Sequence, residues 1–522
     1  MPTPEAASRN AGSRLDVRSR ALRRGAWFAV LMLLVFLLVR PALRPDPKPD
    51  SVPDLRVPSS APSELDETET PRPYPPSPLP STATPPPIPN AKPAPYAWGA
   101  QVKSLRPDLV SPEVVMAPDA TPDLDQPVIA AGKTWVLMTG EGILGRESTA
   151  PDARIRLHGL DAVTGRRRWQ LAMPYGLCGS HLLDGKLACA SGETVDETTG
   201  LPTRWRLQLV DPASGKVTAS TTVDGWFTMA AVQSDRFILV EQAQPAPKLV
   251  VHAFTASLAP AWRTDLSVHP LHAGFFSGNR FVTRHDLTVP KGLALEKVRL
   301  RQVDQMLALW GTRHMAFLDL TNGKVRGVLA CSRLVDDGVR IWCNEQGRAA
   351  AYSRDLKPLF RTAPGVRLAH PRVDRRHGDR SVPVFVNQHG QVVGVNRAMG
   401  KTQGVIADTS AHSTVADALE PIAVQAGGSI FIDDASGVIG LDQSGTKAVW
   451  AVQDYVTLEV LSHGKQALLS DQQVLDVVDP VTGAVSARFK DLPGYTIAGV
   501  GNPADDAIIS VGLDGLWRLR LP

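Results

Sequence analysis

The sequence has few cysteines, few aromatic residues and none of several familiar catalytic motifs. Its 522 residues include only 4 Cys, and Phe, Trp and Tyr together make up 6% of the chain. No C-x-x-C spacing is present, which argues against a zinc site made of thiolates. H-E-x-x-H and G-x-S-x-G are absent as well, so the signatures of zinc proteases and of serine hydrolases are missing.

Outside its first residues the chain has no excess of either charge. The formal net charge is +4, and residues 1–24 account for it with six Arg against Glu5 and Asp16, 6 − 2 = +4. The remainder holds 50 basic and 50 acidic residues, 56 − 6 and 52 − 2. A nucleic-acid-binding domain needs a basic surface, so no nucleic-acid partner is expected. Residues 1–24 are interpreted as a basic cytoplasmic tail.

A single apolar run follows this tail. Residues 25–39 carry no charge, Arg23 and Arg24 precede them, and Arg40-Pro41 follows. This is the pattern of an export signal. No A-x-A cleavage site and no nearby Cys for lipid attachment are present, which favours an uncleaved transmembrane anchor over residues 25–43, although cleavage stays open. The basic side predicts a cytoplasmic N-terminus and an extracytoplasmic remainder.

The next segment is rich in proline. Residues 41–97 contain 19 of the 44 Pro. Proline lacks the amide donor that helices and sheets require, so residues 44–97 are expected to form a disordered, extended linker. Residues 98–522 are expected to form the main domain.

The main domain repeats a pattern of an apolar strand, an Asp, a short Gly-containing turn and another strand. An Asp before a turn can accept hydrogen bonds from backbone amides two or three residues later, and Gly supplies the positive φ of the turn. We therefore interpret these residues as structural turn caps. The better copies contain the pairs Asp161 and Gly165, Asp211 and Gly215, Asp319 and Gly323, Asp442 and Gly445, and Asp479 and Gly483, and weaker copies end near Ser257, Asp355 and Gly400.

A bulky residue on the strand after the turn can wedge between neighbouring sheets. Trp169, Trp450 and Phe489 are the candidates for this blade docking. They lie four, five and six residues after their glycines, which would put Trp450 on the opposite side of its strand unless a β-bulge intervenes.

The segment Leu160-Asp-Ala-Val-Thr-Gly-Arg-Arg-Arg-Trp169 resembles the PQQ-like repeat, A-L-D-x-x-T-G-x-x-x-W. This repeat occurs in quinoprotein dehydrogenases and in non-enzymatic propellers of the BamB type. The resemblance implies an all-β fold, a PQQ-like β-propeller preceded by one transmembrane helix and a disordered linker. We predict eight blades, with seven and nine left open. A strand from about residues 95–120 is expected to complete the last blade and close the ring.

The four cysteines form two similar pairs. Cys178 and Cys189 flank an Asp-Gly, as do Cys331 and Cys343. Asp-Gly between apolar runs predicts a hairpin, which would bring each pair together across neighbouring strands. Two local disulfides are therefore predicted, consistent with an oxidising compartment, and buried free thiols are the alternative.

The chain departs from the quinoprotein enzymes that it resembles. Those enzymes hold Ca²⁺ and an Asp base on the propeller axis, often above two adjacent Cys, and this chain has no adjacent Cys. One Asp per blade at the same turn cannot converge on one ion. No catalytic residue and no metal site are predicted, no cofactor-binding residue is assigned, and PQQ and Ca²⁺ are not supported.

We expect a single-pass membrane protein whose extracytoplasmic propeller binds or scaffolds an envelope protein of unknown identity. The alternatives are a PQQ- and Ca²⁺-dependent dehydrogenase-like enzyme and an envelope sensor that binds a small ligand. Long loops on propellers often carry binding. Residues 284–302 and the charged residues 375–380 are the candidate binding loops.

Overall fold

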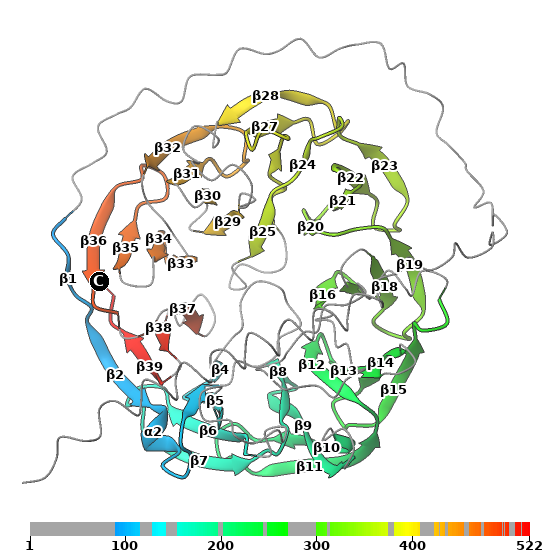
Figure 1. Cartoon of the computed structure of the whole chain (residues 1–522), viewed down its shortest axis with the longest axis vertical. Coiled ribbons are helices and arrows are strands. Elements are labelled where there is room, and N and C mark those ends of the chain that lie inside the picture. Colours follow the sequence, from blue (N-terminus) through cyan, green and yellow to red (C-terminus); the bar gives the residue numbers. More distant parts are fainter. Residues whose placement is uncertain are drawn as a thin grey trace, which may run out of the picture. The chain divides into compact units, whose positions relative to one another are not determined.

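The main domain is a β-propeller with nine blades (Figure 1). The chain divides into two compact units, residues 1–72 and residues 73–522, and the structure describes residues of the second only. It is a computed structural model, and it describes residues 89–114, 128–141, 154–196, 202–243, 248–269, 299–310, 314–373, 381–407, 422–426, 429–433, 437–453, 459–470, 474–492, 494, 496–500, 507–512 and 514–521.

Each blade is an antiparallel sheet of four main strands, called a to d from the axis outward. We number the blades 1 to 9 in chain order. Blade 1 contains β4 (Val128–Ala131), β5 (Thr134–Glu141), β6 (Arg156–Asp161) and β7 (Arg167–Ala172). Blade 2 contains β8 (Leu177–Leu183), β9 (Lys186–Val195), β10 (Pro202–Val210) and β11 (Val217–Asp224). Blade 3 contains β12 (Phe227–Gln233), β13 (Arg236–Ala243), β14 (Lys248–Phe254) and β15 (Pro260–Asp265).

The middle of the chain forms the next three blades. Blade 4 contains β16 (Arg299–Val303), β17 (Met306–Trp310), β18 (Met315–Asp319) and β19 (Val325–Leu329). Blade 5 contains β20 (Leu334–Asp336), β21 (Ile341–Glu345), β22 (Arg348–Tyr352) and β23 (Pro358–Arg361). Blade 6 contains β24 (Arg367–Leu368), β26 (Phe385–Val386), β27 (Val392–Val395) and β28 (Thr402–Ala407).

The C-terminal third forms the last three blades. Blade 7 contains β29 (Ile422–Ala426), β30 (Ser429–Asp433), β31 (Gly437–Leu441) and β32 (Ala448–Gln453), and β25 (His370–Val373) pairs with β29. Blade 8 contains β33 (Glu459–His463), β34 (Gln466–Ser470), β35 (Val474–Val478) and β36 (Val485–Lys490). Blade 9 contains β37 (Thr496–Val500), β38 (Ala507–Gly512), β39 (Gly515–Leu519) and, from the other end of the domain, β2 (Tyr96–Gln101).

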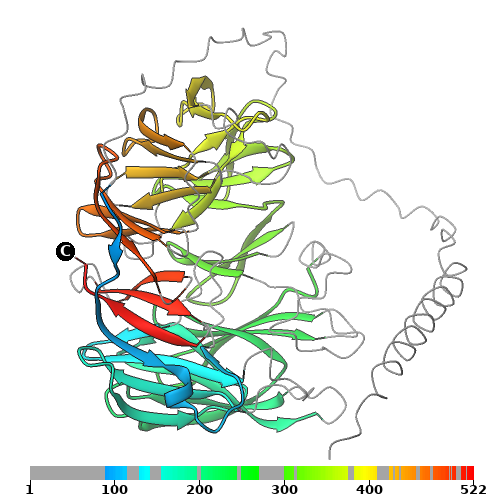
Figure 2. The ribbon, with the colours of Figure 1, turned by 60° about the vertical axis from the view of Figure 1, so that its left-hand side comes forward.

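The structure has nine blades, a count that the sequence left open beside the preferred eight, and blade 9 differs from the others. The sequence contains eight turns of the kind that joins strand c to strand d, because the three weak copies each form a complete blade. Blade 9 has no such turn, since its outer strand β2 comes from the N-terminal side of the domain and pairs with β39, with Trp98 beside Arg518. This pairing confirms the predicted closure of the ring, which Figure 2 shows as β2 beside β39.

The hydrophobic core is divided among the contacts between blades. Nine clusters of buried apolar side chains occur in the described residues, and each cluster joins two consecutive blades. Strand side chains alternate between the two faces of a sheet, so each blade packs one face on the blade before it and one on the blade after it. The last of these contacts, between blades 9 and 1, includes Trp98, Trp135 and Leu516.

The residues before blade 1 cross three blades. We call residues 92–114 the strap. Within it, β1 (Lys92–Pro93) pairs with β36 of blade 8, β2 completes blade 9, and β3 (Pro112–Val114) pairs with β5 of blade 1. The short helix α2 (Val102–Leu105) connects β2 to β3. β1 and the start of β2 fall within the range 44–97 that the sequence predicted as linker.

The membrane segment lies outside the described residues. Among the residues that the structure does describe, no helix is both long enough and apolar enough to cross a membrane. Residues 25–43 and most of the linker belong to the part without description.

Candidate functional site

The turns between strands c and d use their Asp residues as predicted caps. In blade 1, Oδ1 of Asp161 accepts hydrogen bonds from the amides of Val163 and Thr164, at 3.1 and 2.9 Å. The carbonyl of Asp161 accepts from the amide of Gly165 at 2.8 Å, and Gly165 has a φ of 68°. The hydrogen bond from the Thr164 amide is the main reason that the pKa of the Asp161 carboxyl lies below its usual value.

The same arrangement recurs around the ring. The Asp carboxylates of the other four turns accept hydrogen bonds from nearby backbone amides. In the weak copy of blade 6, the side-chain oxygen of Asn396 accepts the equivalent hydrogen bond. The pairs are Asp211 with Ala213, Asp319 with Thr321, Asp442 with Thr446, Asp479 with Val481, and Asn396 with Ala398. The turn glycines Gly215, Gly323, Gly445 and Gly483 have φ values of 71, 72, 66 and 73°. Each acid thus serves the backbone of its own blade.

Trp169 and Trp450 dock on the turn of the following blade. The indole N–H of Trp169 donates to the carbonyl of Pro212 at 2.8 Å, and that of Trp450 donates to the carbonyl of Pro480 at 3.0 Å. Their rings lie over glycines of the same turns: a Cβ added to Gly215 would lie 2.6 Å from Cδ2 of Trp169. The glycine therefore leaves room for the indole of the preceding blade.

A bulge places both tryptophans on the same side of their strands. Trp169 pairs with Gly159 and Trp450 with Gly440, and in each case the register shifts at the next pair. Counted from the cap the two spacings are equal, 169 − 161 = 8 and 450 − 442 = 8. The different spacing from glycine arises because Gly445 comes one residue earlier in its turn than Gly165 does.

Phe489 does not occupy the position of the docking tryptophans on its strand. It lies ten residues after its cap, 489 − 479 = 10, and Ala487 lies at the position that is occupied by tryptophan elsewhere. Phe489 packs in the core between blades 8 and 9 with Ala94 and Leu519. Blade 9 offers no turn between strands c and d for it to dock on.

Three further docking residues were missed by the sequence analysis. The indoles of Trp98 and Trp262 donate to the carbonyls of Ala162 and Leu320, at 3.1 and 2.8 Å. They lie over Gly165 and Gly323, and Phe360 lies over Gly400 in the same way. Trp262 and Phe360 follow turns without a capping Asp or a glycine, and Trp98 follows no turn at all, so the repeat pattern gave no signal for them.

At two junctions between blades the bulky residue lies on the turn and the small residue lies on strand d, the opposite of the arrangement above. At the junction of blades 2 and 3, strand d carries the small Ala219, and the turn of blade 3 carries Leu258, which is buried in the same cluster. At the junction of blades 4 and 5, Gly327 faces Leu356, whose Cδ1 would lie 2.9 Å from a Cβ on that glycine. Both leucines have positive φ, 63 and 60°, a conformation that non-glycine residues rarely adopt.

The two predicted disulfides are confirmed. Cys178 and Cys189 are directly opposite each other on β8 and β9, with Cα atoms 4.1 Å apart. Cys331, which precedes β20, is joined to Cys343 on β21, with Cα atoms 5.5 Å apart. The first hairpin turns at Asp184 and Gly185, both with positive φ, as the Asp-Gly signal predicts. All four cysteines of the chain are in these bonds.

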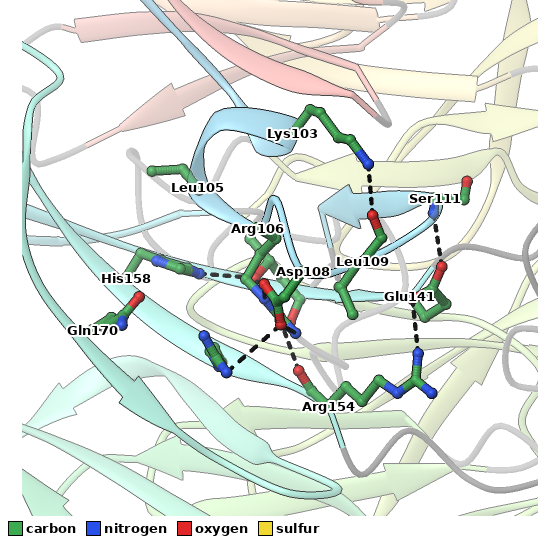
Figure 3. Close-up of polar contacts among 12 residues, drawn as sticks. Lys103, Leu105, Arg106, Asp108, Leu109, Ser111, Glu141, Arg154, His158 and Gln170 are labelled. Atoms are coloured by element: carbon green, nitrogen blue, oxygen red, sulfur yellow. Dashed lines mark hydrogen bonds and ion pairs between the residues drawn. The ribbon is translucent and has the colours of Figure 1, made fainter.

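A polar cluster locks the strap to blade 1 (Figure 3). Arg106 follows α2 and is only 1% exposed. Its guanidinium donates to the carbonyl of Arg154 at 2.7 Å and to Oγ1 of Thr139 at 3.3 Å, and it forms an ion pair with Asp108. A buried guanidinium is costly unless its donors are paired, and here most of its partners belong to blade 1. Arg106 therefore ties the closing segment to the first blade.

His158 completes this cluster. Its Nε2 lies 2.9 Å from Oγ1 of Thr139, and its Nδ1 is buried without a hydrogen-bond partner. Burial, and then the charge of Arg106, lowers the pKa of His158 to about 3. The imidazole is therefore neutral at neutral pH, and the cluster is arranged for packing and hydrogen bonding.

A shallow pocket of about 370 Å³ lies where the strap meets blades 9 and 1. It is lined by Gly99, Ala100, Gln101, Ser104, Leu105, Gly165 and Trp517. None of these side chains titrates, so this pocket offers neither a general acid nor a general base.

The described residues contain no group of three or more His, Cys, Asp or Glu that could hold a metal ion. The candidate binding loop at residues 375–380 lies outside the described residues, as do residues 284–298 of the other loop, whose last residues belong to β16.

Several large apolar side chains are exposed at one end of the blades, while the two most exposed in the described residues, Val110 and Val268, lie at the other end. In each up-and-down sheet, the a–b hairpin and the c–d turn lie at the same end, which we call the turn face. Val163 and Val481 occupy the same position after their capping Asp, and both are 68% exposed. Met399 in the turn of blade 6 and Val339 in the a–b hairpin of blade 5 are similarly exposed. The capping residues of these turns accept hydrogen bonds from backbone amides, so the turns present apolar tips; the caps are Asp161, Asp479, Asn396 and Asp337.

Comparison with known proteins gives likeness of fold only. No family model and no curated protein sequence matches the chain. Among solved structures, BamB from Moraxella catarrhalis is 10% identical, with a TM-score of 0.37, over 81% of this chain and 99% of its own. A europium-containing methanol dehydrogenase is 11% identical, with a TM-score of 0.41, over 82% of this chain and 93% of its own.

A quinohemoprotein alcohol dehydrogenase from Comamonas testosteroni is 12% identical, with a TM-score of 0.39, over 78% of each chain. The structural neighbours thus include BamB and quinoprotein dehydrogenases, the two groups that the repeat resembles. Neighbours at these identities do not decide between binding and catalysis.

Proposed function

We propose that this chain is a membrane-anchored, extracytoplasmic propeller that binds a protein partner of the cell envelope through its turn face. The observation that carries the proposal is the set of apolar turn tips on that face, with Val163 and Val481 both 68% exposed. These tips come from different blades, and exposed apolar groups on one face can supply the contacts of a protein-binding surface. The turns that hold them are fixed by caps and by docked tryptophans, which keeps the surface preorganised.

Two observations support the compartment. The domain holds two disulfides, and such bonds persist where the surroundings are oxidising. The sequence supplies an apolar segment at residues 25–43 with its basic side toward the N-terminus, which orients the main domain outward. We propose that this segment anchors the propeller and that the proline-rich residues space it from the membrane.

Site-specific photo-crosslinking in intact cells tests the binding surface. A photoreactive amino acid replaces Val163 or Val481, and the matched control replaces Val268, which is 82% exposed at the opposite end of its blade. We expect a discrete adduct of the same mass from both turn positions and none from Val268. The identity of the partner follows from mass spectrometry. Adducts that are absent at both turn positions, or equally strong at Val268, would contradict the proposed surface.

We propose that the protein binds a partner and does not catalyse a reaction. The absence of catalysis is tested by a separate experiment. The full chain, purified in detergent, is incubated with PQQ and Ca²⁺ and assayed for dye-linked oxidation of alcohols and sugars. We expect no cofactor absorbance to remain after desalting and no dye reduction. Stoichiometric retention of PQQ together with turnover would show an enzyme.

A further inference from the structure

The outer strands of the blades lie on the perimeter of the ring (Figure 1), and each has one edge without a partner within its own blade. Such an edge presents free backbone N–H and C=O groups and can pair with another strand. The protein itself shows this on blade 8, where β1 adds to β36 in parallel, with Lys92 beside Phe489. An outer edge of this propeller is therefore able to accept a further strand.

Most outer strands carry features that discourage such pairing. Charge, proline, bulges and short length all protect sheet edges. The protected strands are β7 with Arg167 and Arg168, β15 with Pro260 and Arg263, β19 with Arg326, β23 with Pro358 and Arg361, and β28, whose pairing with β27 is irregular at two places.

β11 has fewer of these features, since its pairing with β10 is irregular at one place only. It has eight residues, more than any other outer strand, and it contains no proline and no charge before Asp224 at its end. Six of its eight residues are exposed. Among the other outer strands without charge or proline, β2 and β32 bury the aromatic residues Trp98 and Trp450, and β28 exposes only one of its six residues. Thr and Val favour extended backbone. β11 is therefore the open edge of the ring most suited to pairing.

The sequence of this strand is complementary to itself. When two copies of β11 run antiparallel with Ser220 opposite Ser220, each residue before Ser220 faces the residue equally far after Ser220 in the other copy. Lys216 of one copy then faces Asp224 of the other. The remaining pairs in this register are Val217 with Val223, Thr218 with Thr222 and Ala219 with Thr221. Opposite charges and like β-branched pairs are the cross-strand contacts that stabilise antiparallel sheets.

We propose that the protein forms a symmetric dimer with a second copy of itself through β11. The two four-stranded sheets of blade 2 join into one sheet across a two-fold axis at Ser220. Asp224 lies between Lys216 of the other copy and Arg204, its cross-strand neighbour on β10, so both ends of the contact are balanced in charge. The inference does not rest on the proposed partner, which would use the turn face.

Cysteine crosslinking of the full chain in detergent tests the register. All four native cysteines are in disulfides, so an added cysteine supplies the only free thiol. Ser220→Cys places two thiols at the two-fold axis, and copper phenanthroline should convert most of the protein to a disulfide-linked dimer. Thr222→Cys is the matched control, because it faces Thr218, and should give little dimer alone but a crosslink when mixed with Thr218→Cys.

Exchange of charge tests the contact without a crosslink. Sedimentation equilibrium of the full chain should show a dimer that Lys216→Asp weakens about tenfold, because two like-charge pairs replace two opposite ones. Asp224→Lys should weaken the dimer to a similar extent, and the variant with both Lys216→Asp and Asp224→Lys should form the dimer again. Lys324→Asp, at the equivalent position of blade 4, should change nothing. A monomer at every concentration, equal crosslinking of both single cysteines, or failure of the double variant to restore the dimer would overturn the proposal.

Discussion

The junction of blades 1 and 2 and the junction of blades 2 and 3 fill the same space from opposite sides. In the first, Trp169 on strand d reaches over Gly215 in the following turn. In the second, strand d offers only Ala219, and Leu258 in the following turn supplies the bulk. The repeated feature is therefore a filled volume between an outer strand and the next turn. The residue that fills it can belong to either side, which explains why a sequence motif finds some junctions and misses others.

The largest effect is expected where an indole fills the junction. Trp169→Ala should lower the free energy of unfolding by about 3–5 kcal/mol, because it opens a cavity and leaves the carbonyl of Pro212 without its donor. Urea denaturation of the full chain, followed by circular dichroism, measures this. Trp169→Phe keeps most of the volume and should cost about 1 kcal/mol. An alanine variant as stable as the wild type would show that the junction does not depend on the indole.

The reversed junction should be convertible into the common type. Leu258→Gly should cost about 2–3 kcal/mol, since the lost volume outweighs relief of its positive φ, and Ala219→Trp should be destabilising by overpacking. The double variant should regain at least about 1 kcal/mol relative to the sum of the two. Its indole would lie near the carbonyl of Ala256, the residue after the cap position, which corresponds to the acceptors used by the natural tryptophans. Strict additivity would contradict equivalence of the two arrangements.

Alanine substitutions at two glycines distinguish the cost of a positive φ from the cost of a clash between the new Cβ and a docked indole. Gly215 and Gly347 have φ values of 71 and 81°, but only Gly215 has an indole where a Cβ would lie, and nothing is within 4 Å at Gly347. Gly347→Ala should lose about 1 kcal/mol from positive φ, and Gly215→Ala about 2 kcal/mol or more. Thermal unfolding of both variants measures the difference. Equal losses would show that the docked indole moves away at no cost.

A pH-dependent effect is expected at the closing junction, between blades 9 and 1. The folded pKa of His158, about 3, lies below its ordinary value of 6.5, so the neutral form is favoured by folding. The stability it contributes is complete above about pH 6.5 and falls as the pH drops toward 3. His158→Gln should reduce this loss between pH 6.5 and 4.5. Unfolding midpoints of both proteins at these two pH values test it, and an unchanged pH dependence would contradict a role for His158.

Much of the architecture could be predicted because the strongest signals are local. An Asp before a turn, a Gly at positive φ and an Asp-Gly between two cysteines specify their own hydrogen bonds and hairpins within a few residues. The closing strand could also be anticipated, since the last unit lacks an outer strand. The number of blades was left between seven and nine, with eight preferred, because the weak copies near Ser257, Asp355 and Gly400 lack the full turn signal.

The rest depends on contacts between residues that are distant in sequence. Leu258 and Leu356 replace glycine at the tip of a turn, and their role is visible only when the facing strand is known to be small. Arg106 carries no signal of burial, because its partners, such as Thr139 and Arg154, are brought to it by the strap. Phe489 is apolar and close to the expected spacing, but the blade it faces has no turn.

The order in which the chain is made gives the strap a further consequence. Synthesis begins at the N-terminus, so Tyr96–Gln101 is among the first parts of the domain to exist, whereas its partner Gly515–Leu519 is among the last. The first strand must wait, unpaired, for nearly the whole domain to appear. A product that stops before Gly515 can neither complete its ninth sheet nor close its ring, so ring closure distinguishes finished chains from truncated ones.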